Sequence, residues 1–170
     1  MFYELSVVQF SKMLKNLDAI LDKGADYAKQ KNFDVSVLLN ARLAPDQFNL
    51  IRQVQIACDA AKLGVARLTG KVESCPSHPD TETTLEELKA RIHSVLAYLE
   101  TFKPEDFANA ATQEIHNKWW GGKTLNGFDF IIQHCTPNVY FHITTAYAIL
   151  RHNGVSIGKD DYLGALPFQQ

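Results

Sequence analysis

Cysteine is scarce in this sequence, and the motifs of common nucleotide and catalytic sites are missing. Its 170 residues include 3 cysteines, with no CxxC pair among them. An odd number of dispersed cysteines argues against a disulfide framework and fits reduced thiols in a cytoplasm, which is the location we expect. The sequence has no P-loop, no GxGxxG and no Ser-His-Asp pattern. No common catalytic class is therefore indicated by motif.

Long apolar runs and an excess of one charge sign are also absent. No segment approaches the roughly 20 apolar residues that span a bilayer, so we expect no membrane partner. Lysine and arginine number 17 against 19 acidic residues, a formal net charge of −2. This balance argues against nucleic acid as a partner. The length predicts one domain over residues 1–170 that buries a real core.

Three segments instead show apolar residues at alternating three- and four-residue spacing. The first runs from Leu5 to about Gln30, the second from Pro45 to Leu68 and the third from Thr84 to Phe102. Each pattern predicts an amphipathic helix. We expect Pro45 and the following aspartate to begin the second helix, because proline is tolerated in a first helical turn. Thr83 or Thr84, followed by two glutamates, predicts a capped start for the third.

The fourth helical segment, PNVYFHITTAYAILRHNG, is apolar on more than one side. We expect Asn126 to cap a helical segment that begins near Phe128 and leads into it. Pro137 interrupts this helix, so we expect either a kink there or a fresh start at Thr136 and Pro137. Four such helices predict an all-α four-helix bundle. Residues 155–170 lack a helical period but keep apolar side chains, so we expect them to lie across the bundle. Surplus apolar surface on the fourth helix predicts a homodimer.

A segment without the helical spacing of apolar residues, TQEIHNKWWGGKTLNG, separates the third and fourth helices. Its paired glycines predict a small β-hairpin. Two interpretations of Trp119 and Trp120 stay open. They fix the hairpin to the bundle, or together with Tyr140 and His134 they line a pocket for a small molecule.

The segments PNVYFHITTAYAILRHNGVSIGKDDYLG and LAPDQFNLIRQVQIACDAAK resemble a domain-of-unknown-function branch of the DinB/YfiT-like four-helix-bundle superfamily. The resemblance covers essentially the whole chain. It implies a bundle in which a divalent metal lies between helices, held by a histidine of the second helix and an HxxxH pair of the fourth. Superfamily members with known activity include thiol-dependent transferases and isomerases.

Carried over residue by residue, the resemblance places His142 at the second histidine of the pair and Asn138 at the first. The second-helix ligand falls on Gln53 or Gln55. Two of the three implied ligands are therefore amides, which are poor ligands for zinc, nickel or iron. We predict no tightly bound transition metal. The favoured hypothesis is a non-catalytic small-ligand or scaffold module, and the alternative is a metal-dependent enzyme with an altered ligand set centred on His142.

Other residues of the right chemistry are weaker candidates. His134 precedes His142 by eight residues, about 12 Å along a helix, too far for both to bind one ion. Asp59 is a candidate base, but its place beside the apolar stripe favours an ordinary hydrogen-bonded side chain. The pair Cys75 and His78 has half of a zinc-ligand spacing, with no second half nearby. No role is assigned to the histidines at positions 93, 116 and 152.

Overall fold

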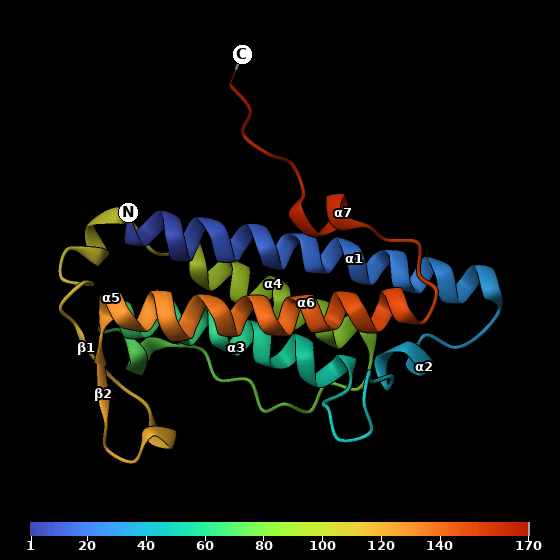
Figure 1. Cartoon of the computed structure of the whole chain (residues 1–170), viewed down its shortest axis with the longest axis horizontal. Helices are drawn as coiled ribbons and strands as arrows, with labels where there is room; N and C mark the ends of the chain where they lie inside the picture. The colour runs from blue at the N-terminus through green and yellow to red at the C-terminus, as the bar shows by residue number, and fades with distance from the viewer. Residues whose placement is uncertain (170) are drawn as a thin grey trace.

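The protein is a helical bundle in the computed structural model, which describes residues 1–169. Four long helices lie side by side: α1 (Gln9–Lys31), α3 (Leu50–Leu68), α4 (Leu85–Leu99) and α6 (Thr136–His152). α1 and α6 run in one direction along the bundle, and α3 and α4 run in the other (Figure 1). Figure 1 shows α1 and α6 side by side, with α4 behind them and α3 below. The predicted all-α bundle with a small hairpin between its third and fourth long helices is confirmed.

Shorter elements connect and extend these helices. They are η1 (Glu4–Val8), α2 (Ser36–Leu39), η2 (Val72–Ser74), η3 (Pro104–Phe107), β1 (Glu114–His116), η4 (Lys118–Trp120), β2 (Thr124–Asn126), α5 (Gly127–Asp129), η5 (Phe130–Cys135) and α7 (Lys159–Leu163). Within residues 1–169, no helix is both long enough and apolar enough to cross a membrane.

The predicted apolar stripes form one continuous core. α3 lies at its centre, where it packs against α6, α4 and α1. Full burial of a leucine, isoleucine or phenylalanine contributes about 1.5–3 kcal/mol, so the stripes supply most of the stabilisation. The largest fully buried side chains are Phe10, Phe130, Leu14, Leu17, Ile20, Leu21, Leu38, Leu39, Leu50, Leu68, Leu88 and Ile92.

Side-chain caps decide where two of the long helices begin. Thr84 and Glu87 form the predicted capping box, with Glu87 N donating to Thr84 Oγ1 at 3.2 Å and Thr84 N to Glu87 Oε2 at 3.0 Å. The prediction that Pro45 begins the second helix is wrong. α3 begins at Leu50, because Asn49 is extended and its Oδ1 accepts from Arg52 N at 3.1 Å. An asparagine in this position satisfies a free helix-end donor, which Pro45 cannot do.

The helix type changes beside Pro137: α6 begins at Thr136, directly after η5, with the proline in its first turn. The backbone stays helical through Thr136 (φ −61°, ψ −49°), and the preceding turn, η5, is π-helical. A π-helical turn bonds residue i to i+5 and so accommodates the disruption of the usual ladder beside a proline. Asn126 Oδ1 accepts from Asp129 N at 2.8 Å, which confirms the predicted cap.

The hairpin projects from one end of the bundle (Figure 1). Its strands pair antiparallel with Ile115 opposite Leu125, and Ile115 is buried. Trp119 and Trp120 lie in the turn between the strands, in η4.

The segment after α6 lies on the bundle only in part. Ile157 is buried, and α7 packs on α1, where Asn16 Nδ2 donates to the Tyr162 carbonyl at 2.9 Å. Beyond α7 the chain leaves the bundle (Figure 1), with Leu166 and Phe168 exposed. The prediction that the whole tail covers the bundle is therefore wrong beyond α7, and Gln170 lies outside the described residues.

Candidate functional site

The position of the implied metal holds a buried hydrogen bond. His142 Nδ1 lies 2.7 Å from Gln53 Oε1, and Gln53 Nε2 donates to the Phe48 carbonyl at 3.1 Å. Because the amide nitrogen of Gln53 is already donating to Phe48, its oxygen is the acceptor for His142. We therefore assign the proton to Nδ1 of a neutral imidazole. The two side chains satisfy each other across α3 and α6.

The environment of His142 keeps its ring neutral. Burial, with a further contribution from the charge of Arg52, lowers the pKa of His142 to about 4. The ring is 8% exposed. At neutral pH it is a hydrogen-bond donor to Gln53 and carries no charge.

The residues at the implied metal position do not fit a transition metal. Asn138, the third residue of the implied set, lines a surface groove. Within residues 1–169, no group of three or more His, Cys, Asp or Glu side chains is arranged to hold a metal ion. One imidazole with two amides is too weak a donor set for zinc, nickel or iron.

The groove beside this pair has a volume of about 440 Å³. It lies between α3 and the η5–α6 segment, next to the turn of the hairpin. Three residues predicted from the sequence meet there, namely Trp119, His134 and Asn138. The other lining residues are Arg52, Ile56, Asp59, Ala60, Leu63, Arg67, Asp80, Asn117 and Lys118. A slightly larger hollow of about 470 Å³ on the outer side of α1 brings together no cluster of catalytic or ligand-type side chains.

The two tryptophans have different surroundings. Trp119 is 80% exposed at the groove, with Lys118 Nζ 4.8 Å from its ring centre. Trp120 packs edge-on against His134, with ring centres 5.1 Å apart, and against Phe130 at 6.3 Å. Trp120 therefore fixes the hairpin turn to η5, and only Trp119 lines the groove.

His134 is held between aromatic rings. Its ring stacks on Phe130 with centres 5.5 Å apart, and Trp120 meets it edge-on. Burial and the nearby Arg67 charge lower its pKa. Its Nδ1 is buried without a hydrogen-bond partner among the described residues. An unpaired lone pair is less costly than an unpaired N–H, so we assign the proton to Nε2.

Tyr140 lies apart from the groove, although the sequence analysis placed it with the tryptophans. It is half-buried against the core, and burial raises the pKa of its hydroxyl.

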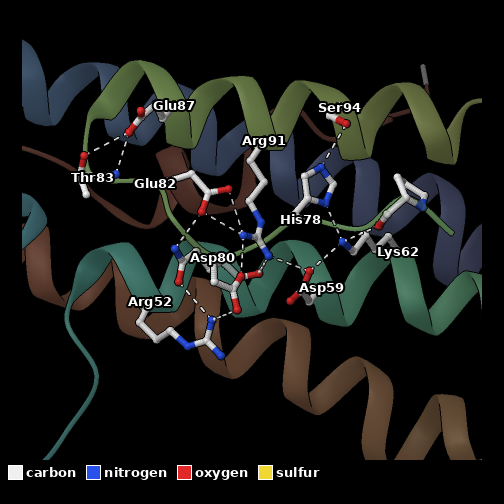
Figure 2. Close-up of polar contacts among 12 residues, drawn as sticks. Arg52, Asp59, Lys62, His78, Asp80, Glu82, Thr83, Glu87, Arg91 and Ser94 are labelled. Carbon is white, nitrogen blue, oxygen red and sulfur yellow. Dashed lines mark hydrogen bonds and ion pairs between the residues drawn. The ribbon is translucent and has the colours of Figure 1, made fainter.

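A buried arginine, which the sequence analysis did not single out, organises the polar side of α3 and α4. The side chain of Arg91 is 1% exposed. Its guanidinium donates to Asp59 at 2.7 Å, to Asp80 at 2.7 Å and to Glu82 at 3.0 Å. Figure 2 shows it reaching from α4 toward these three carboxylates. Burial alone would lower the pKa of Arg91, but the carboxylates outweigh it and raise that pKa.

Neighbouring side chains extend this network along α3. Arg52 binds Asp80 at 2.6 Å, and buried Lys62 binds Asp59 at 2.9 Å. Lys62 also donates to His78 Nδ1 at 2.6 Å, and the other ring nitrogen of His78 lies 3.2 Å from Ser94 Oγ. Asp59, the candidate base, is thus an ion-pair partner of two cations, Arg91 and Lys62. Both ring nitrogens of His78 also have partners.

The cysteines have the surroundings of packed thiols. Burial raises the pKa of Cys58 to about 12 and that of Cys135 to about 12. Cys135 Sγ occupies the space that a side chain at Gly64 would need. Burial also raises the pKa of Cys75, at the side of the bundle near Tyr98. A raised thiol pKa disfavours the nucleophilic thiolate.

A sequence signal for Arg91 existed but is weak. Arg91 follows Leu88 by three residues and adjoins Ile92, so it stands on the buried stripe of α4. Acidic residues at 80 and 82 lie in the loop just before that helix. A cation on an apolar stripe next to an acidic loop is the pattern that could have indicated a buried ion-pair network.

We expect Arg91→Gln to destabilise the fold by about 3 kcal/mol, because it leaves three clustered carboxylates without their central cation. Urea unfolding at neutral pH measures this. Arg151→Gln, which alters an exposed arginine of α6, should leave the unfolding free energy unchanged.

The same network predicts how the stability of the fold changes with pH. Burial would raise the pKa of Asp80 and Glu82, but hydrogen bonds, including those from Arg91, outweigh it and lower both below their ordinary 3.8 and 4.5. The contribution of these two carboxylates to the free energy of unfolding is complete above pH values of 3.8 and 4.5 and is lost as pH falls below them. A loss from Arg91→Gln that stayed constant through this acid range would contradict the assigned ion pairs.

We expect the His142 ring to remain neutral in the folded protein well below its ordinary pKa of 6.5, down to about 4. A buried neutral histidine contributes stability that is complete above 6.5 and lost as pH falls toward 4. A ¹H–¹⁵N NMR titration, with the signal assigned by His142→Asn, checks the charge and the Nδ1–H tautomer. The urea-unfolded chain is the control. A ring that titrates near 6.5 when folded would refute the buried pairing.

Comparisons with known proteins agree with this architecture. The family model for DUF1993, a domain of unknown function, matches residues 2–163. A crystal structure of a DinB family member protein from Shewanella denitrificans is 65% identical, with a TM-score of 0.97, and the match covers 100% of this chain and 96% of that one. No curated protein matches the chain. The chain therefore belongs to the DUF1993 family, a DinB-like domain of unknown function.

Proposed function

We propose that this chain is a non-catalytic binding module that has lost the metal centre of its superfamily and holds a small ligand in the groove between α3 and η5–α6. The observation that carries the proposal is the His142 to Gln53 hydrogen bond at 2.7 Å. It joins the two positions that would have to coordinate the metal. The amide of Gln53 is in turn tied to the Phe48 carbonyl.

Metal binding at this position has a clear cost. Gln53 is 1% exposed and His142 is 8% exposed, so a metal would have to break a buried hydrogen bond between them. A buried polar group left without its partner costs about 1–3 kcal/mol. The replacement would be an amide oxygen, which first-row transition ions bind weakly.

The groove supplies the surface for the proposed ligand. Its volume of about 440 Å³ lies within the range of small-molecule sites, roughly 300–1,000 Å³. Trp119 presents a large aromatic ring there that is 80% exposed. An exposed tryptophan beside a concave surface is typical of a binding site, because its burial on binding releases water from apolar surface.

Metal analysis of protein purified without a histidine tag tests the loss of the metal centre. We expect far less than one zinc, nickel or iron per chain, and no change in metal content in His142→Ala. About one ion per chain that disappears in His142→Ala would refute the proposal. It would favour the alternative, a metal-dependent, thiol-transferase-like or isomerase-like enzyme centred on His142.

We also propose that the chain forms a homodimer through the outer side of η5–α6. Exposed apolar residues recur there at four- and five-residue spacing, as expected where a π-helical turn joins an α-helix. They are Ile132, Pro137 and Phe141, preceded by Phe128 in α5. An exposed apolar stripe of this kind is typical of a surface between subunits.

Light scattering during size-exclusion chromatography measures the association. The chain mass is 19.1 kDa, and we expect about twice that value at micromolar concentration. Phe141→Glu should restore the monomer mass, because it places charges in the centre of the proposed contact. Val37→Glu, at another exposed apolar residue, on α2, should not. A monomer mass for the unmodified protein would end the dimer proposal.

A further inference from the structure

The acids that line the groove are neutralised by cations of the bundle itself. Asp80 binds Arg52 at 2.6 Å and Arg91 at 2.7 Å. Asp59 binds Arg91 at 2.7 Å and Lys62 at 2.9 Å. Each carboxylate therefore has two cationic partners. Neither is left to attract a cation from solution or to balance a further positive charge in the groove.

Two lining cations remain without an acidic partner in the described chain. Arg67, in the last turn of α3, is half-buried and forms no ion pair within residues 1–169. Burial lowers its pKa. An arginine stays protonated despite such a shift. The second cation, Lys118, contacts the ring of Trp119 and no carboxylate.

Aromatic surface lies next to these cations. Trp119 and His134 line the same groove as Arg67, and the Arg67 charge is close enough to lower the pKa of His134. The proton assigned to Nε2 of His134 makes this nitrogen a further donor. A guanidinium binds a carboxylate through two parallel hydrogen bonds, and an exposed indole offers a flat face for stacking.

We infer that the ligand of this groove is a small aromatic carboxylate, whose carboxylate pairs with Arg67 and whose ring stacks on Trp119. The inference rests on the proposed function, since it names the ligand class of the same groove. Lys118 adds positive charge on the hairpin side. Charge alone would admit any small anion, and the exposed ring alone would admit any flat molecule. The two together select a molecule that carries both features.

Titrations with benzoate and naphthoate test the inference. The chain has 2 tryptophans, so indole N–H signals in ¹H–¹⁵N NMR spectra separate Trp119 from Trp120 once Trp119→Phe assigns them. We expect saturable shifts of the Trp119 indole with either acid. The neutral isostere benzamide, and the ring-free anions acetate and inorganic phosphate, should bind at least about 10-fold more weakly.

Variants assign the two contacts. Arg67→Gln should weaken benzoate binding about 10- to 100-fold, as expected for a hydrogen bond to a charged group. Arg67→Lys keeps the charge without the two-donor geometry and should weaken it less. Arg151→Gln, at an exposed arginine of the same chain, should leave affinity unchanged. Unaltered thermal unfolding of each variant confirms that the fold is intact.

The outcomes separate failure of the ligand class from failure of the groove as a site. If benzamide binds as tightly as benzoate, or Arg67→Gln has no effect, the carboxylate assignment is wrong and the binding-module proposal stands. If phosphate matches benzoate, the aromatic part is wrong. If none of the probes shifts a groove signal, the inference falls. One metal ion per chain lost in His142→Ala would overturn the proposed function itself.

Discussion

The burial of Arg91 is the constraint on which the polar half of this bundle depends. A guanidinium that is 1% exposed is tolerated only if carboxylates and hydrogen-bond acceptors surround it. One carboxylate, Asp59, and the Gln55 carbonyl come from α3, whereas Asp80 and Glu82 come from the loop before α4. The loop is therefore held against both helices, and this places Asp80 in the wall of the groove.

This network also occupies carboxylates that could otherwise bind a metal ion. The acids Asp59 and Asp80 on the polar side of α3 are bound by Arg91, Arg52 and Lys62. Arg52 extends the effect, because its charge helps to keep His142 neutral. Carboxylates engaged by buried cations bind metal poorly, since coordination would leave those cations unpaired.

The sequence was sufficient for the parts of the fold that depend on periodic apolar spacing and local caps. The helix that begins after Thr84 is an example, because its capping box involves residues three apart. The predicted start of the second helix at Pro45 was wrong. Proline is favoured in a first helical turn, but the side chain of Asn49 caps the helix and sets its start at Leu50. The sequence gives only a weak signal for the Arg91 network. Its pairing with Asp59 could not be predicted, since the two residues are 32 positions apart and their proximity depends on how the helices pack. The placement of Trp119, Trp120 and Tyr140 on different surfaces depends on the same packing.

Asn138 and His142 show how one helix serves two surfaces. They are one turn apart on α6, yet His142 faces Gln53 in the core and Asn138 faces the groove. A histidine at position 138 could act as a ligand only if His142 gave up its bond to Gln53. With asparagine there, the residue implied as a metal ligand is instead part of the groove wall, beside Arg52. The internal hydrogen bond and the open groove are thus compatible, because His142 forms the bond and Asn138 lines the groove.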